Sequence, residues 1–363
     1  MFYQNCIRHP LYSESLMLRG ILDLYGLTGD TVTVTPFGTG LVNHTWLVSA
    51  GKGKFILQRI NDGIFKNPTD IAHNIRLIGE YLSEHYPGYL FVMPEKTTAH
   101  EDMVHLPAQG YFRLFPFVKD SHAVEVVHTT QQAYGAARQF GRFSKLLSGF
   151  RAEKLHITLP GFHNLTMRYA QFEKALQKGN PLRIGESAET IRYLQSQRNI
   201  AMTYENVCAN SSFRKRVTHH DTKISNVLFN GHDNAICVID LDTIMPGYFL
   251  SDVGDMMRTY LCPVSEEEQN LDLVEIREDY FKAIADGYLG EMAGELTATE
   301  RSHFVYAGKC MVYMQALRFL TDYLNNDVYY GSKYEGHNLV RAKNQTALLQ
   351  KLIAKEALLG ALF

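Results

Sequence analysis

Hydrophobic residues follow a helical period at the start of the chain and then change to a period of two. Between residues 13 and 25 they recur three to five positions apart, which predicts a helix. Over 31–35 they alternate with threonines, which is typical of a β-strand. The alternation also predicts strands over 44–48 and 55–59, and a helical period returns over 69–84. The first part of the chain therefore mixes strands with helices.

Two more predicted strands, over 90–93 and 111–118, complete this part, and the helical period then dominates. The predicted helices span 129–148, 166–178, 185–205, 265–292, 297–325 and 338–359. A pair of strands around Asn230-Gly231 interrupts them. The pattern predicts an α+β protein with a small β-rich lobe over 1–118 and a larger, mostly helical lobe over 119–363.

Composition narrows the class of protein. The 363 residues include 36 Lys and Arg against 38 Asp and Glu, so the net charge of −2 argues against a nucleic-acid partner. The five cysteines form no C-x-x-C pair, which favours a reducing compartment. The chain has no signal-peptide pattern at its start and no apolar run of about 20 residues. We therefore expect a cytoplasmic enzyme without a membrane partner, a monomer or a weak dimer.

The strongest motif is His219-x-Asp221-x-x-x-x-Asn226, followed after a predicted hairpin by Asp240. Phosphoryl transfer needs a base that accepts a proton from the substrate hydroxyl and hard oxygen ligands for Mg²⁺. Asp221 is the candidate base, and Asn226 and Asp240 are the candidate metal ligands. The alternative is that these are ordinary polar turn residues, but Asp221, Asn226 and Asp240 all fit the spacing of a kinase motif.

Three further residues are assigned supporting roles. His219 is expected to hold the loop through backbone hydrogen bonds rather than to act in catalysis. Asp242 and Asp255 are expected to brace the same region. A zinc site at the histidines is disfavoured because they lack helical spacing and cysteine partners.

A glycine-bearing turn, Gly38-x-Gly40-x-x-Asn43, lies between the first two predicted strands. Because a strand rather than a helix follows, the turn suits a loop that covers phosphates from above, with a simple hairpin turn as the alternative. The third strand is expected to supply a cation to the phosphates. Gln58 and Arg59 both fit the count, and we select Arg59 because it carries a charge. Glu80 is its candidate acidic partner, or else part of a solvated helix face.

These motifs resemble the aminoglycoside phosphotransferase and choline kinase superfamily, which has a protein-kinase-like two-lobed fold. The shared positions are Gly40-x-x-Asn43, His219-x-Asp221-x-x-x-x-Asn226 and Ile239-Asp240-x-Asp242. The stretches 159–163, 217–223, 238–247 and 318–324 resemble one branch most closely, the N-acetylhexosamine 1-kinases. One departure is His220, where that branch is expected to have Asn, so acceptor preference is in question.

The resemblance implies Mg²⁺-dependent transfer of phosphate from ATP to the anomeric hydroxyl of N-acetylglucosamine or N-acetylgalactosamine. Nucleotide contacts are expected from Gly38, Gly40 and Asn43 of the glycine-bearing turn and from Arg59. Acceptor contacts are expected from four residues in the matching stretches of the sugar-facing lobe: Arg113, His163, Arg318 and Tyr329. For each of them, an ordinary polar contact between helices is the alternative.

Two alternatives stay open. The first is a kinase for another small hydroxyl compound, such as an amino alcohol, an aminoglycoside or another sugar. The second is a nucleotide-binding pseudokinase, which the uncertain strand cation favours slightly and the intact Asp221, Asn226 and Asp240 disfavour.

Overall fold

The computed structural model describes residues 10–29, 31–38 and 42–363. The chain divides into two compact units, Met1–Asp120 and Ser121–Phe363. None of the described helices combines the length and the apolar character that crossing a bilayer requires.

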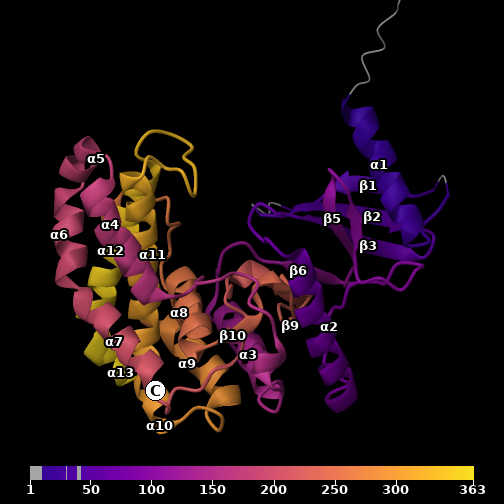
Figure 1. Cartoon of the computed structure of the whole chain (residues 1–363). Helices are drawn as coiled ribbons and strands as arrows, with labels where there is room; N and C mark the ends of the chain where they lie inside the picture. The colour runs from indigo at the N-terminus through magenta and orange to yellow at the C-terminus, as the bar shows by residue number, and fades with distance from the viewer. Residues whose placement is uncertain (1–9, 30, 39–41) are drawn as a thin grey trace, which may run out of the picture. The chain divides into compact units, whose positions relative to one another are not determined.

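The first unit is a five-stranded antiparallel sheet with two helices (Figure 1). The strands lie in the order β1-β2-β3-β5-β4. The elements are α1 (Pro10–Leu24), β1 (Thr33–Pro36), β2 (His44–Ala50), β3 (Gly53–Ile60), α2 (Pro68–His85), β4 (Val104–Leu106) and β5 (Gly110–Pro116).

Alternation along β3 and β5 gives the sheet one apolar face and one mixed face, on which Gln58 and Arg113 lie among apolar side chains. Leu57, Phe112 and Leu114 are buried in the same cluster as Ile21 and Leu22 of α1. Since successive side chains of a strand point to opposite faces, the residues between them lie on the other face. The helix α1 therefore covers one side of the sheet, and Gln58 and Arg113 lie on the other side.

The predicted strand over 90–93 is wrong. This segment has no regular secondary structure, and only Glu95 forms a single bridge, to Leu114. Pro94 has no backbone N–H and cannot extend a ladder of hydrogen bonds. The fifth strand is instead β4, which pairs with β5 through Val104–Leu106.

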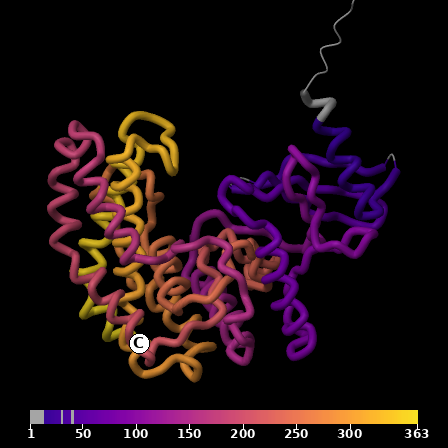
Figure 2. The backbone as a smooth tube through the Cα atoms, viewed as in Figure 1, coloured from indigo at the N-terminus to yellow at the C-terminus, as the bar shows by residue number. Residues whose placement is uncertain are grey.

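The second unit is mostly helical and is built around α11 (Phe304–Leu324), which packs against α4, α8 and α12. Its other helices are α3 (Thr130–Leu146), α4 (Leu165–Lys178), α5 (Pro181–Glu186), α6 (Ala188–Ser196), α7 (Arg198–Ala209), α8 (Phe249–Tyr260), α9 (Glu278–Met292), α10 (Ala298–Ser302), α12 (His337–Ala354) and α13 (Glu356–Gly360). Most residues of α11 are buried, as expected for a helix that is apolar all round. Figure 2 shows the loop that joins α11 to α12, in yellow.

Two glycines allow α8 and α11 to approach closely. A Cβ at Gly254 of α8 would overlap the backbone of Ala307 on α11, and a Cβ at Gly308 of α11 would overlap Met257 of α8. Interiors are packed tightly, so such a contact tolerates no larger residue without a shift. The two helices therefore form a closely matched pair.

Short strands complete the second unit. They are β6 (Ser121–Ala123), β7 (Arg216–Thr218), β8 (Val227–Asn230), β9 (Ala235–Val238) and β10 (Met245–Gly247). β6, β8 and β9 form one sheet, and β7 pairs with β10. The predicted hairpin at Asn230-Gly231 is the β8–β9 connection, and its neighbouring loops carry the candidate site.

Three of the predicted helices differ from the structure. Residues 185–205 fall into α5, α6 and α7, and residues 297–325 divide into α10 and α11 at His303. The predicted helix over 265–292 begins only at Glu278. In the preceding loop the side chains of Ser265 and Asn270 accept hydrogen bonds from nearby backbone N–H groups, which stabilises turns in place of a helix.

Candidate functional site

The loop between β7 and β8 carries Asp221, and two carboxylates of α8 hold it. The backbone N–H groups of His219 and His220 donate to Asp252 over 3.1 and 2.8 Å. The N–H of Thr222 donates to Asp255 over 2.8 Å. Burial raises the pKa of Asp252 to about 7, although these N–H groups oppose the shift. The loop is thus fixed on both sides of Asp221.

His219 is buried and uses both ring nitrogens on the backbone. Its Nε2 lies 3.0 Å from the carbonyl oxygen of Ile239, and its Nδ1 accepts the N–H of Asp221 over 3.3 Å. This pair of contacts requires a neutral ring with the proton on Nε2. Burial lowers the pKa of His219 to about 4, which agrees with a neutral ring. The side chain is placed to orient the backbone at Asp221.

Asp221 is paired with Lys223, a residue to which the sequence analysis gave no role. The Nζ of Lys223 lies 3.0 Å from Oδ2 of Asp221 and 3.9 Å from Oδ2 of Asp240. Burial acts to raise the pKa of the Asp221 carboxyl, but Lys223 and His219 outweigh it, so this pKa lies below its ordinary value. The spacing of Asp221 and Lys223 could have indicated this pair, because side chains two residues apart in an extended segment point to the same side.

Asn226 and Asp240 lie on neighbouring backbone segments. The N–H of Ile239 donates to the carbonyl oxygen of Asn226 over 2.9 Å, and the Asn226 amide Nδ2 donates to the Asp221 carbonyl oxygen over 2.8 Å. Asp240 has a φ of +61°, in the left-handed region, which aspartate adopts more readily than most non-glycine residues.

The donor set of these two residues fits Mg²⁺. With its Nδ2 engaged, Asn226 presents its side-chain oxygen, and Asp240 adds a carboxylate that is 38 % exposed. Hard oxygen donors are what Mg²⁺ prefers, and the ion usually keeps water and phosphate ligands as well. Among the described residues no cluster of three His, Cys, Asp or Glu could hold a metal by itself.

Asp255 connects the loop to a network of charges. Its Oδ1 accepts from Nε of Arg258 over 3.0 Å, and Arg258 donates onward to Glu266 over 3.0 Å. Glu266 also pairs with Arg341. Asp242 is buried, with 2 % of its surface exposed, in the turn that follows Asp240.

Next to the loop, two histidines share one serine. The Nδ1 atoms of His163 and His220 both contact the hydroxyl of Ser251, the latter over 2.7 Å. Burial lowers the pKa of His220 to about 3 and lowers the pKa of His163 well below its ordinary value. His163 also stacks on Phe162 with ring centroids 4.2 Å apart. Two neutral, hydrogen-bonding imidazole rings therefore lie beside the backbone of Asp221.

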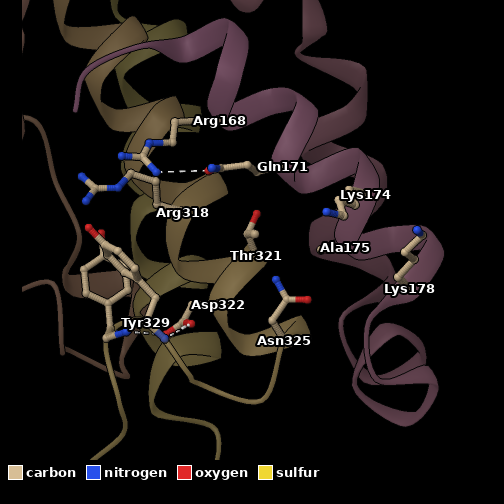
Figure 3. Close-up of a pocket in the computed structure, with 11 residues that line it drawn as sticks. Arg168, Gln171, Lys174, Ala175, Lys178, Arg318, Thr321, Asp322, Asn325 and Tyr329 are labelled. Atoms are coloured by element: carbon tan, nitrogen blue, oxygen red, sulfur yellow. Dashed lines mark hydrogen bonds between the residues drawn. The ribbon is translucent and has the colours of Figure 1, made fainter. Parts of the chain in front are cut away.

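Two of the predicted acceptor residues lie together. Arg318 and Tyr329 line a cavity of about 420 Å³ on α4, α11 and the loop after α11 (Figure 3). His163 connects to them through Phe162, whose ring lies 5.5 Å from the Arg318 guanidinium. Arg113 requires a correction, because it lies on β5 of the first unit and not in the larger lobe.

In the first unit, Asn43 ties the glycine-bearing turn to the end of β3. Its Oδ1 accepts the N–H of Asn61 over 3.0 Å, and the Asn61 amide donates to the Val42 carbonyl over 3.2 Å. Gly38 has a φ of +76°, which favours glycine. The prediction for Gly40 lies outside the described residues.

The two candidates for the strand cation lie on opposite faces of the sheet. Arg59 pairs with Phe112 on the apolar face, beside Gly110. Gln58 pairs with Arg113, which donates from Nε and Nη2 to Oε1 of Gln58 over 3.1 and 2.8 Å. A guanidinium from the neighbouring strand is thus held at the position of the uncharged Gln58. Glu80 is 57 % exposed and pairs with Arg76 on its own helix.

Comparison with known families gives one match that covers most of the chain. The sequence pattern of the family described as "Phosphotransferase enzyme family" matches residues 33–287. These limits include the glycine-bearing turn, the loop at Asp221 and Asp240.

Solved structures of kinases share the fold. An amicoumacin kinase in complex with AMP-PNP, Ca²⁺ and Ami has a TM-score of 0.62 at 13 % identity, over 95 % of this chain and 96 % of that one. A microcompartment-associated aminopropanol kinase has a TM-score of 0.59 at 13 % identity, over 95 % and 98 %. A choline/ethanolamine kinase family protein from Mesorhizobium loti has 0.56 at 18 %, over 98 % of both. The predicted two-lobed α+β fold of the kinase-like type is confirmed.

Proposed function

The chain belongs to the phosphotransferase enzyme family, and we propose that it transfers the γ-phosphoryl group of ATP to the anomeric hydroxyl of a free N-acetylhexosamine. The family supplies the reaction class, a phosphotransferase with an alcohol acceptor. The use of ATP is supported by the similar kinases, one of which binds AMP-PNP. The acceptor and the residue roles are our proposal.

One observation carries the choice of acceptor. The cavity at Arg318 and Tyr329 is lined by basic, amide and aromatic side chains, and Asp322 is the single acid among its described lining residues. Both carboxylate oxygens of Asp322 already accept backbone N–H groups, those of Tyr329 and Tyr330, over 2.7 and 2.9 Å. A cationic acceptor, such as an amino alcohol or an aminoglycoside, would find no available counter-charge there. Amide and aromatic groups suit the hydroxyl groups and the ring faces of a sugar.

In the proposed reaction, Asp221 accepts the proton of the acceptor hydroxyl while the acceptor oxygen forms a bond to the γ-phosphorus. The bond from that phosphorus to the β-γ bridging oxygen breaks, and ADP leaves. The low pKa of Asp221 keeps it ionised before the transfer. An anomeric hydroxyl suits such a weak base because the ring oxygen makes it more acidic than other sugar hydroxyls.

Asn226 and Asp240 would hold Mg²⁺, which neutralises charge on the β- and γ-phosphates when bound. Lys223, 3.0 Å from Asp221, is placed to counter the negative charge that collects around the transferring group. In the first unit, we assign the phosphate-binding cation to Arg113, held by Gln58, in place of the Arg59 favoured from the sequence.

The test compares free N-acetylglucosamine and N-acetylgalactosamine with their methyl glycosides, which are blocked at C1. We expect ADP release only with the free sugars and a product whose phosphorus signal couples to the anomeric proton. Turnover of the methyl glycosides or a 6-phosphate product would refute the anomeric acceptor. Turnover of choline or an aminoglycoside with no sugar activity would favour the first alternative, and nucleotide binding with no turnover at all would favour the pseudokinase.

A further inference from the structure

The cavity described above is strongly basic on the side formed by α4. Its volume of about 420 Å³ falls in the range of small-molecule sites, about 300–1,000 Å³. Four cations line it: Arg168, Lys174 and Lys178 from α4, and Arg318 from α11. Figure 3 shows the two arginines next to each other, with the two lysines further along α4.

The two arginines have only neutral partners among the described residues. Arg168 donates to Gln171 over 3.1 Å and to the Phe162 carbonyl over 3.2 Å, and Arg318 donates to Gln315 over 3.0 Å. The Nε atoms of both side chains are buried and have no hydrogen-bond partner in the described part of the chain. Partly buried cations without a carboxylate are costly, since their desolvation is not compensated.

The two guanidinium groups also repel each other. Burial lowers the pKa of Arg168, and the nearby charge of Arg318 lowers it further. Asp322 does not relieve this, because its carboxylate is used by the backbone of Tyr329 and Tyr330 and by Nδ2 of Asn338 at 3.1 Å. An oxyanion between the arginines would supply the missing partner through charge-assisted hydrogen bonds.

We propose that this cavity is an anion-binding subsite for the end of the acceptor that is remote from the reacting hydroxyl. The acceptor is then an acidic sugar, in which an N-acetylhexosamine with a free C1 carries a carboxylate or a phosphate. This inference rests on the proposed sugar kinase function and extends it.

A continuous line of contacts connects the subsite to the base. From Arg318 it passes to Phe162 at 5.5 Å, to His163 at 4.2 Å, and to His220 at 5.6 Å, the residue next to Asp221. These packed rings couple the position of Arg318 to the backbone at Asp221, so an acceptor held by the cations at one end is aligned relative to the base. The rings of Tyr329 and Tyr330, which line the cavity, suit the apolar faces of a sugar.

The experiment compares four acceptors that share a free anomeric hydroxyl. They are N-acetylglucosamine, its 6-phosphate, a disaccharide of a hexuronate linked to N-acetylglucosamine, and an uncharged disaccharide of the same length. We expect kcat/KM at low salt to be at least tenfold higher for one of the charged acceptors than for the uncharged sugar of equal size. The preference should fall as salt is added, since screening weakens the attraction. The charged acceptor that shows it identifies the oxyanion as carboxylate or phosphate.

Variants link the preference to the cavity. Lys174 and Lys178 are exposed, so replacing both with Gln leaves the fold intact, and we expect a several-fold rise in KM for the charged acceptor with kcat retained. Arg168→Gln should reduce the preference for the charged acceptor more than the lysine replacements do, and Arg168→Lys should retain part of that preference. Arg192→Gln removes the same charge from the exposed face of α6 and should change neither value.

Binding of the four acceptors, measured by calorimetry without ATP, separates this inference from the proposed function. Equal affinity and equal kcat/KM for charged and uncharged sugars would overturn the anion subsite while leaving the sugar kinase in place. Tight, salt-sensitive binding of a charged sugar that is lost in the Arg168→Gln variant would support the subsite even if the sugar were phosphorylated elsewhere than C1. A preference unchanged in both cavity variants would also overturn it.

Discussion

The Nζ of Lys223 lies 3.0 Å from a carboxylate oxygen of Asp221, and the same ammonium is 3.9 Å from Asp240. One cation therefore faces both the candidate base and a candidate metal ligand. It holds Asp221 ionised against the effect of burial, so the rate and the pH dependence of the reaction should both depend on it.

Replacing Lys223 with Met removes this charge at similar length. We expect kcat to fall by about a hundredfold, as for the loss of one electrostatic contact in a transition state. Because Lys223 lowers the pKa of Asp221, its loss should move the acid limb of the pH–rate profile to higher pH. Lys282→Met, on an exposed pair in α9, is the control. A fall in kcat with an unmoved acid limb would show that Lys223 does not set the ionisation of the base.

Asp221→Asn keeps the size of the side chain but removes its ability to accept a proton. We expect kcat to fall by about 10²-fold or more, while ATP binding changes little. Steady-state kinetics together with calorimetric titration of AMP-PNP would measure the two effects. Turnover close to that of the unmodified protein would exclude Asp221 as the base.

Asp240→Ala should abolish Mg²⁺-dependent activity, because it removes the charged ligand of the proposed pair. Asn226→Ala should weaken activity less at saturating metal, since an amide oxygen carries no net charge. Activity measured across a Mg²⁺ titration would separate the two variants by their half-saturating concentrations. The assignment fails if Asp240→Ala and the unmodified protein titrate alike.

Arg113 and Arg59 offer a direct comparison of two candidates for one role. We expect Arg113→Gln to raise the KM for ATP about tenfold, equivalent to roughly 1.4 kcal/mol, and Arg113→Lys to restore part of the loss. Arg59→Gln, on the opposite face of the sheet, should leave the KM for ATP unchanged. Thermal melting of each variant would check that the sheet remains folded. A larger rise in the KM for ATP in Arg59→Gln than in Arg113→Gln would assign the phosphate contact to Arg59 instead.

The buried His219 predicts how stability depends on acidity. Its pKa is about 4 in the folded protein, against about 6.5 when exposed. Well above pH 6.5 the His219 imidazole is neutral in both the folded and the unfolded protein, so it does not reduce the free energy of unfolding. As the pH falls below 6.5, the imidazole binds a proton in the unfolded protein but not in the folded protein, and the free energy of unfolding decreases. This single group therefore lowers the free energy of unfolding by about 3 kcal/mol between pH 6.5 and 4.

Denaturant unfolding at several pH values would measure this slope. His219→Gln should reduce the slope across that range, although it lowers stability at neutral pH. His232→Gln replaces an exposed histidine and should leave the slope as it is. An unchanged slope in the His219 variant would assign the acid sensitivity to other groups, such as His220 or His163.

The sequence was most informative where function depends on neighbours in the chain. Asp221, Asn226 and Asp240 were selected from spacing alone, and the structure brings their backbone segments together by one hydrogen bond, from Ile239 to Asn226. The α+β fold also followed from the spacing of hydrophobic residues along the chain. The extended segment before Glu95 and the loop before Glu278 misled the prediction, because an apolar pattern does not reveal whether backbone hydrogen bonds are formed.

Other parts of the site depend on contacts between distant segments. Arg113 reaches Gln58 only because β3 and β5 are paired in one particular register. Asp252 lies about 30 residues after the loop in the sequence, and its hydrogen bonds to His219 and His220 form only because α8 packs beside the loop. The basic cavity joins α4 to α11, which are about 140 residues apart, so no local motif could show it.

The close contact of α8 and α11 at Gly254 and Gly308 has a consequence for how acceptor choice can be altered. Asp252 and Asp255 of α8 hold the loop at Asp221, and α11 carries Arg318, so a substitution that shifts either helix would disturb both the candidate base and the proposed acceptor site. The exposed face of α4 and the loop between α11 and α12 are free of that constraint. Directed evolution toward new acceptors should therefore accumulate its tolerated changes at positions such as Lys174, Lys178 and Tyr329, and leave the two glycines untouched.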